Sequence, residues 1–428
     1  MEYIGYLCGG FTLREGRVKT ASQLPSRWKE VRLSAAEIHE YEQYYLPDFV
    51  RFCLNPDAGE NIAMQRFSCD CGCELILPSD LIRSGRDVGL KVPTLQLYLF
   101  PFKMAMFSIR LEISSDEPDD LTSAVATLRK LNKLGDSALD GFRVAALEPL
   151  AELWRLFSPF AGSVGFDWSR LVEDGNKFNV FQIINRNAAE GEAPQLPSDK
   201  LLFALGTVSP LEKDKVSPLY APSDGYFKKI MSENVLSVYS SWKCLSLSDT
   251  LTILASETPE WLTANWTEDY FGMIYIWQLY RRNYFFRLTR RFRYERQNSS
   301  MLEQETVDFE RNCSFHKISY NFLPEEFSEI VARGLKPDRE KAELYHMISQ
   351  EESKREKLAD NRMNGLLFFM TCLTMASTIY DACCLFQELM PYEEAVGSTV
   401  LGFRLVASAM LTIVLTALLI YRYKTKKS

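Results

Sequence analysis

Two long, nearly uncharged apolar stretches near the C-terminal end constrain this chain more than any other feature. Residues 365–380 carry no charge, and the apolar run resumes after Asp381 as far as Phe386. Residues 395–421 carry one charge, Arg404. Each stretch is as long as the roughly 20 residues that cross a hydrocarbon core. Two such runs side by side are rare among buried core helices, so we predict transmembrane helices at residues 364–387 and 399–421.

The charges that flank these stretches predict the topology. Basic residues precede the first stretch and follow the second: Lys354, Arg355, Lys357, Arg362, Arg422, Lys424, Lys426 and Lys427. The loop between the stretches, residues 388–398, has no Lys or Arg. The positive-inside rule therefore places both termini, including the basic tail at residues 422–428, in the cytoplasm. Residues 1–13 contain no basic segment typical of a signal peptide, so we expect a multi-pass protein of the inner (cell) membrane whose N-terminal part stays in the cytosol.

Composition adds two constraints. The chain has 428 residues, 46% of them hydrophobic and 25% charged, so the membrane signal is local and the rest resembles a globular protein. The net charge of −7 argues against a nucleic-acid-binding surface over the whole protein, and we expect no direct nucleic-acid partner. In the cytosol, the ten Cys are expected as buried thiols or metal ligands and not as a disulfide framework.

The first part of the chain predicts an α+β fold, with a mixed α/β sensor domain at residues 1–258. Alternating or β-branched runs indicate strands at residues 3–8, 95–100, 105–113, 178–185 and 201–208, with β character at 235–255. The strands at 95–100 and 105–113 are expected to form a hairpin. Helices are predicted at residues 119–134 and 149–157.

The pattern becomes helical after residue 258. We predict an antiparallel helical region at residues 259–336, built from helices at 266–297, 301–316 and 324–334. Lys336-Pro337-Asp338 is typical of a helix start with Pro in the first turn. No Pro follows until Pro391, which predicts one helix over residues 338–386, about 70 Å long. Its stalk, residues 337–363, would continue directly into the first membrane helix.

This architecture resembles the CorA family of cation transporters and channels. The local resemblance lies in Asn361-Arg-Met-Asn-Gly365 at the membrane entrance, a Thr-containing first membrane segment, and Met390-Pro-Tyr-Glu393 in the loop. The resemblance implies a homo-oligomer, a pentamer in the family, in a lipid bilayer. The family's Gly-Met-Asn signature is absent, and Phe386-Gln-Glu-Leu-Met390 occupies its place. Because that signature holds hydrated magnesium in the family, its absence argues against magnesium selectivity.

Two segments of the first domain resemble a divergent branch of that family. Leu97-Tyr-Leu-Phe-Pro-Phe102 and Ser241-Trp-Lys-Cys-Leu-Ser-Leu-Ser-Asp-Thr250 are similar to CorA-like membrane effectors associated with type III CRISPR systems. That resemblance implies an antiviral defense channel opened by a nucleotide second messenger, SAM-AMP, a conjugate of S-adenosylmethionine with AMP. Two alternatives stay open: a divalent-cation transporter, and a membrane-anchored enzyme or scaffold.

Polar residues form a stripe along the first membrane helix. Five candidate pore-lining residues fall within an arc of about 100° at 100° per residue: Asn364, Thr371, Thr374, Thr378 and Asp381. The alternative is that the threonines bond to their own helix and pack. Asp381 forms either a cation-binding ring or a structural pair with Arg404. The loop acids Glu388, Glu393 and Glu394 are predicted to form an outer mouth that concentrates cations, unless they serve solubility alone.

Two further clusters carry weaker hypotheses. Arg281, Arg282, Arg287 and Arg290 interleave with aromatic residues and are candidates for binding a nucleotide-type ligand through phosphate pairing and stacking. The alternative is a solvated helix face that bridges to acidic neighbours.

Cys69-x-Cys71-x-Cys73 is a candidate metal site that needs a fourth ligand, Cys53 or His39; otherwise it is a thiol-rich turn with one side buried. The sequence has no Walker loop, no His-Glu-x-x-His and no Gly-x-Ser-x-Gly, and only three His. We therefore expect no enzymatic activity and assign no catalytic residue.

Overall fold

The computed structural model describes residues 1–14, 24–55, 57, 62–130, 137–157, 177–186, 196–210, 222–295 and 299–389, and also 402, 406, 407, 409, 410, 413, 414 and 417. The chain divides into two compact units, Met1–Tyr345 and His346–Ser428. The first unit holds both the α/β part and the helical region predicted at residues 259–336.

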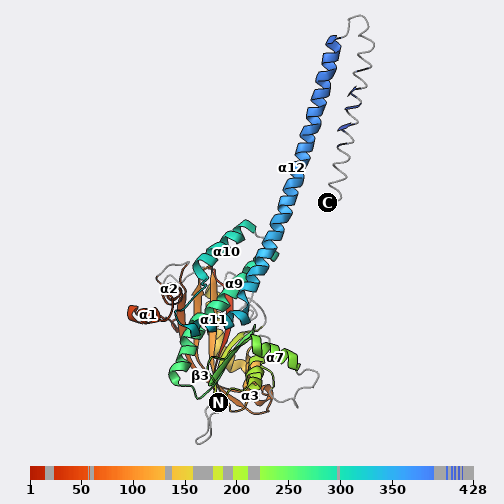
Figure 1. Ribbon diagram of the computed structural model, residues 1–428. Helices are drawn as coiled ribbons and strands as arrows, with labels where there is room; N and C mark the ends of the chain where they lie inside the picture. The colour runs from red at the N-terminus through yellow and green to blue at the C-terminus, as the bar shows by residue number, and fades with distance from the viewer. Residues whose placement is uncertain are drawn as a thin grey trace. The chain divides into compact units, whose positions relative to one another are not determined.

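A nine-stranded mixed sheet organises the first unit (Figure 1). Its order is β2-β3-β4-β5-β1-β6-β9-β8-β7, and the β6–β9 pair is parallel whereas the other pairs are antiparallel. The strands are β1 (Glu2–Thr12), β2 (Trp28–Glu30), β3 (Gln65–Leu77), β4 (Val88–Phe100), β5 (Met104–Ser114), β6 (Asn179–Arg186), β7 (Val235–Leu236), β8 (Trp242–Ser246) and β9 (Thr250–Ser256). The predicted hairpin is confirmed: β4 and β5 are joined by a tight turn in which Phe102 and Lys103 both adopt φ 59°.

One face of the sheet packs against helices of the first two-thirds of the chain. Because side chains alternate along a strand, Tyr3, Leu7 and Phe11 of β1 all enter this core. Leu121, Leu150 and Leu202 meet them from α3, α5 and α6. The helices and helical turns before residue 234 are α1 (Ala35–Tyr41), α2 (Pro47–Leu54), η3 (Ser79–Leu81), α3 (Pro118–Leu128), η5 (Ser137–Leu139), α4 (Asp140–Phe142), η6 (Arg143–Leu147), α5 (Glu148–Phe157), α6 (Asp199–Thr207) and α7 (Asp224–Glu233).

The opposite face packs against an aromatic helix. Tyr6 of β1 stacks on Phe271 with ring centroids 3.8 Å apart, and Phe100 of β4 stacks on Tyr280 at 4.0 Å. The helical elements of this part are α8 (Glu260–Asn265), the π-helix η10 (Trp266–Tyr275), α9 (Ile276–Tyr294), α10 (Ser299–Cys313), α11 (Phe322–Leu335) and α12 (Pro337–Leu389). The predicted long helix is confirmed as α12, which runs without interruption from the first unit into the second.

The structure corrects two secondary-structure predictions. The helix predicted at residues 119–134 ends at Leu128, and Lys130 forms a β-bridge with Lys177 instead. Residues 201–208 were expected as a strand but lie in α6 and its C-cap. The Ser198 side chain accepts a hydrogen bond from the Leu201 backbone and caps the helix N-terminus, while Val208 ends it in the left-handed conformation. The apolar run is buried on most of its sides, so its periodicity does not separate a buried strand from a buried helix.

Candidate functional site

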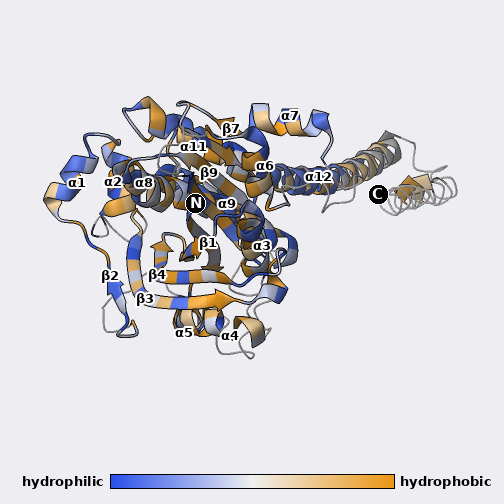
Figure 2. Cartoon of the chain, turned by 90° about the horizontal axis from the view of Figure 1, so that it is seen from below, coloured by the Kyte–Doolittle hydropathy of each residue, from blue (hydrophilic) through white to orange (hydrophobic). Residues whose placement is uncertain are grey.

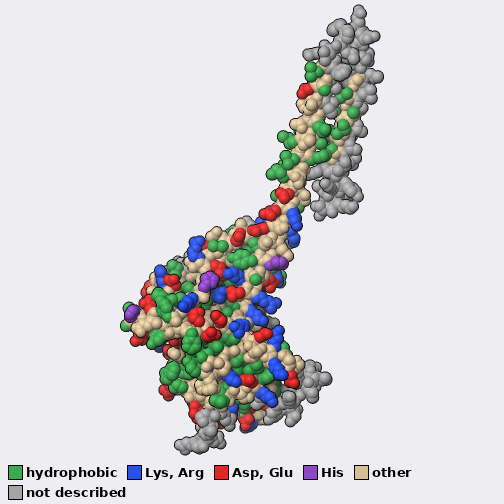
Figure 3. All heavy atoms as spheres, in the orientation of Figure 1, with side chains coloured by type: hydrophobic (Ala, Val, Ile, Leu, Met, Phe, Trp, Pro, Cys, Tyr) green, Lys and Arg blue, Asp and Glu red, His purple; other side chains and the backbone are tan. Residues whose placement is uncertain are grey.

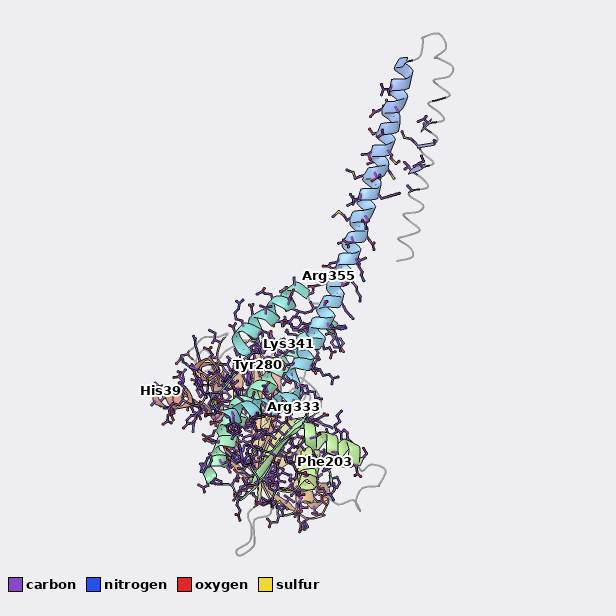
Figure 4. The ribbon with its side chains drawn as sticks, in the orientation of Figure 1. His39, Phe203, Tyr280, Arg333, Lys341 and Arg355 are labelled. Atoms are coloured by element: carbon purple, nitrogen blue, oxygen red, sulfur yellow. The ribbon has the colours of Figure 1, made fainter. Side chains whose placement is uncertain are left out.

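The start of α12 is held by ion pairs within the first unit. Arg281 of α9 donates to Asp338 at 2.8 Å, and Lys341 donates to Glu310 of α10 at 2.7 Å. Figure 4 labels Lys341, which lies on α12, and Tyr280, which lies on α9. Buried Leu344 adds apolar contact to the same turns. The beginning of the long helix is therefore positioned by side chains of α9 and α10.

The later part of α12 is exposed and apolar. Figure 2 shows a hydrophilic first part followed by a hydrophobic part, and Figure 3 shows hydrophobic side chains gathered there. Phe369, Met370 and Leu373 are each more than half exposed. Among the described residues, one helix is long and apolar enough to span a membrane, and none of its most apolar window is buried. A continuous row of exposed large apolar side chains is costly in water and is what a lipid-facing helix presents.

The threonines of the polar stripe bond to their own helix. The hydroxyl of Thr371 donates to the Leu367 carbonyl at 2.8 Å, and that of Thr378 donates to the Thr374 carbonyl at 2.7 Å. Thr374 donates to the carbonyls of Met370 and Thr371 at 3.1 and 2.9 Å. Each hydroxyl proton is thus used inside the helix, whereas the remaining lone pairs on each hydroxyl oxygen stay available. The stripe therefore presents hydrogen-bond acceptors.

A different face of α12 is the one that packs within the second unit. Gly365, Cys372 and Ala376 are its half-buried residues between 353 and 385, at positions where burial is described. The apolar pocket beside them is also lined by Val414 and Ala417. At 100° per residue, this face is turned by about 150° from the polar stripe. The stripe is therefore exposed, as are most side chains in this part of α12.

The C-terminal end of α12 carries two of the predicted acids. Asp381 is exposed on the helix. Glu388 lies in the last turn of α12 as it is described, while Glu393 and Glu394 lie outside the described residues, as does Arg404. The outer mouth and the Asp381–Arg404 pair therefore stay predictions.

The arginines of α9 are paired inside the first unit. Besides its bond to Asp338, Arg281 lies over the Trp277 ring at 5.2 Å. Arg282 donates to the Ser248 carbonyl at 2.7 Å, and Arg287 donates to the Glu305 carboxylate at 3.3 Å.

Arg291 joins the same carboxylate, with its Nη1 2.8 Å from both Glu305 oxygens. Arg290 also has a partner. These contacts fit the second interpretation of the arginines, in which their side chains connect α9 to acidic and backbone groups of neighbouring elements instead of binding a ligand. The proposed nucleotide contact for Arg281, Arg282, Arg287 and Arg290 stays a prediction that these internal partners disfavour.

The cysteine cluster lies on β3. Within the described part of the chain, no three His, Cys, Asp or Glu side chains come together so that they could hold a metal ion. Cys53 is fully buried on α2, and His39 is exposed on α1, where Figure 4 labels it. The structure therefore does not assemble Cys69, Cys71 and Cys73 into a metal site, because successive positions of one strand give no convergent third and fourth ligand.

One half-buried carboxyl group was not predicted. Asp269 of η10 accepts a hydrogen bond from Tyr41 of α1, and burial raises the pKa of Asp269 to about 6. Arg66 of β3 lies near it and opposes this shift. The sequence signal was weak because Glu268-Asp269 resembles an ordinary acidic first turn of a helix.

The geometry thus offers one extended candidate site, the acceptor stripe of α12, and one helix that joins it to the first unit. No family model matches the chain, and neither the curated proteins nor the solved structures include a significant match.

Proposed function

We propose that this chain is a subunit of a CorA-like homo-oligomeric membrane channel, a pentamer by resemblance. In this proposal α12 and residues 399–421 both cross the membrane, with both termini in the cytoplasm. The observation that carries the proposal is the division of α12 into two faces. One face packs against residues of the second unit, and the exposed stripe of Asn364, Thr371, Thr374, Thr378 and Asp381 is left for a shared axis.

The chemistry of the stripe favours cations. Three threonine hydroxyls donate their protons to their own helix, so they offer oxygen lone pairs to a passing ion. Asp381 adds a carboxylate on the same arc. Repeated around an axis, these oxygens would form rings that attract cations and repel anions. This observation also favours the alternative, a divalent-cation transporter without the usual selectivity signature.

The fixed start of α12 supports regulation from the first unit. Asp338 and Lys341 tie the first turns of the helix to α9 and α10, and no break interrupts the helix before Leu389. A ligand that binds the first unit more tightly in the open state would then shift the pore. A change from 1:99 to 99:1 needs about 5.5 kcal/mol, or about 1 kcal/mol for each of five sites. We propose a nucleotide messenger of the SAM-AMP type as that ligand and antiviral permeabilisation of the membrane as its outcome.

Thiol accessibility tests the pore. Single Cys substitutions at Thr371, Thr378 and Asp381, in a chain whose own Cys are replaced, are compared with Phe369→Cys, which lies on the opposite side of the helix and lines the apolar pocket. Conductance in planar bilayers should fall when a charged methanethiosulfonate reagent reacts at the stripe. It should change little at position 369. Equal block at all four positions would refute the assignment of the stripe to the pore.

A second measurement separates the channel from the transporter. Ion flux into liposomes is recorded with and without an adenine-nucleotide conjugate. Flux only in the presence of the conjugate supports the gated channel, and flux of divalent cations without it supports the transporter. A chain that stays monomeric in detergent and conducts no ions would favour a membrane-anchored scaffold.

A further inference from the structure

The apolar pocket of the second unit ends at a cation. It has a volume of about 470 Å³ and is lined by apolar side chains of α12, among them Leu366 and Leu373, and by Val414 and Ala417. Among the described residues that line it, Arg362 alone carries a charge. The pocket therefore joins a hydrocarbon-like interior to a single guanidinium.

A second pocket continues along α12 from the same arginine. It has a volume of about 450 Å³, shares Arg362 and Leu366 with the apolar pocket, and reaches back to Arg355. Arg355, which is labelled in Figure 4, is paired with Glu351 at 3.4 Å. Arg362 is exposed, and within the described part of the chain no carboxylate forms an ion pair with it. Its charge is therefore available to an anion at the entrance of the apolar pocket.

The depth of this arginine suits a lipid headgroup. If α12 enters the membrane at residue 365, as proposed, Arg362 precedes the span by three residues, about 4.5 Å along the helix. Polar headgroups lie just outside the hydrocarbon core at that level. From Gly365 to Ala376 the pocket follows α12 for about 16 Å, close to half of the roughly 30 Å core. Its length therefore matches one acyl chain of one leaflet.

We propose that an anionic phospholipid binds here, with one acyl chain in the apolar pocket and its phosphate on Arg362. A guanidinium presents its N–H groups in one plane and pairs with a phosphate through two parallel hydrogen bonds. Basic sites between membrane helices on the cytoplasmic side are typical binding places for anionic headgroups. This site rests on the proposed insertion of α12 into the membrane, and it does not require ion conduction.

A helix of a second copy fits this pocket less well than a lipid does. In a symmetric oligomer every copy carries Lys354, Lys357 and Arg362 at the same depth in the membrane. A neighbouring helix seated in the pocket would bring its own basic residues toward Arg362, and like charges repel. An anionic headgroup in the same place neutralises Arg362 instead. The charge at the entrance therefore favours a lipid as the occupant.

Native mass spectrometry of the full chain in detergent tests the proposal with phosphatidylglycerol and phosphatidylcholine of identical acyl chains. Phosphatidylglycerol should bind about fivefold more tightly, the usual effect of one basic residue on an anionic lipid. Arg362→Gln should abolish this preference and Arg362→Lys should keep most of it. Lys357→Gln is the matched control, because Lys357 is exposed on the same helix and lines neither pocket. Equal affinity for the two lipids, or equal loss in the Arg362→Gln and Lys357→Gln variants, overturns the proposal.

Cys372 gives a readout that needs no variant. It lines the apolar pocket, whereas Cys384 is exposed on α12 outside it. Phosphatidylglycerol should slow the alkylation of Cys372 by N-ethylmaleimide more than phosphatidylcholine does, and should leave Cys384 unchanged. The soluble headgroup glycerophosphoglycerol should protect neither thiol, because it has no acyl chain.

Equal slowing at Cys372 and Cys384, or protection by the soluble headgroup, would contradict a lipid in this pocket. Flotation with liposomes tests the proposed function separately. A chain that floats but shows no preference for phosphatidylglycerol refutes the lipid site alone, and a chain that does not float refutes the membrane insertion itself.

Discussion

Replacing Glu305 distinguishes a structural arginine cluster from a ligand site. Glu305 of α10 accepts hydrogen bonds from Arg287 at 3.3 Å and from Arg291 at 2.8 Å. The Arg287 side chain is 9% exposed, and that of Glu305 is 24% exposed. The Glu305→Gln substitution removes the carboxylate charge and leaves a nearly buried guanidinium without its counter-charge.

The expected loss of unfolding free energy follows from this burial. Breaking a fully buried ion pair by removing one partner costs about 3–5 kcal/mol. Because Glu305 is partly exposed, solvent screens the pair, and we expect about 2–3 kcal/mol. For a unit of this size, that corresponds to a decrease in Tm of about 4–6 °C at roughly 2 °C per kcal/mol.

Thermal unfolding of the full chain in detergent, followed by intrinsic fluorescence, measures the effect. Glu303→Gln is the matched control, since Glu303 is exposed on the same helix two residues away. Its Tm should stay within about 1 °C of the unchanged chain, as for most surface substitutions. If Glu305→Gln leaves the Tm unchanged, or if both variants lose the same amount, the arginines do not depend on Glu305 and the bridging interpretation fails.

Three further predictions test other parts of the structure. Because burial raises the pKa of Asp269 to about 6, the folded state favours its protonated form, and this contribution to stability is lost as the pH rises from about 4 to 6. Asp269→Asn should therefore raise the unfolding free energy at pH 7 by about 3 kcal/mol and flatten its dependence on pH, whereas Glu268→Gln, which removes only a lesser cause of the raised pKa, should have a smaller effect. A Gly-Gly insertion after Ser353 should preserve ligand binding, measured by calorimetry, and abolish ligand-dependent flux; unchanged flux would exclude α12 as the coupling element. A reporter fused after Ser428 should be active in the cytoplasm, and periplasmic activity would rule out two membrane spans.

Residues with a strong periodic or compositional signal were predicted well from sequence. The hairpin of β4 and β5 and the unbroken helix α12 each depend on local patterns: alternation around a tight turn in one case, and the absence of Pro between Pro337 and Pro391 in the other. The strand β3 was missed because its sequence holds three Cys, a Gly and several charges. Its strand conformation is stabilised by pairing with β4, a tertiary interaction that propensity does not contain.

The role of the α9 arginines could not be predicted from the sequence. Alternating arginines and aromatic residues fit both phosphate recognition and internal ion pairing. The choice depends on which acids lie nearby, and Asp338 is 57 residues from Arg281 along the chain. For the polar stripe, the sequence identified the residues but not their surroundings. Its residues were found from spacing alone, but only the pocket that Val414 and Ala417 line beside α12 shows which face of the helix packs and that the stripe lies away from it.

The charges along α12 divide the helix into a charged first part and an apolar second part. Arg362 is the last basic residue before the apolar part, and Asp381 is the next charged residue after it. Residues 365–385 span about 30 Å at 1.5 Å per residue, the thickness of a hydrocarbon core. In the proposed membrane span, Asp381 falls about 6 Å inside the C-terminal end, where a carboxylate is tolerated if it meets water. A lipid-facing Asp381 would be costly, whereas one on the stripe can be hydrated from an outer vestibule. Under the proposed topology, the position of this carboxylate thus links the depth of α12 in the membrane to the direction in which its polar face points.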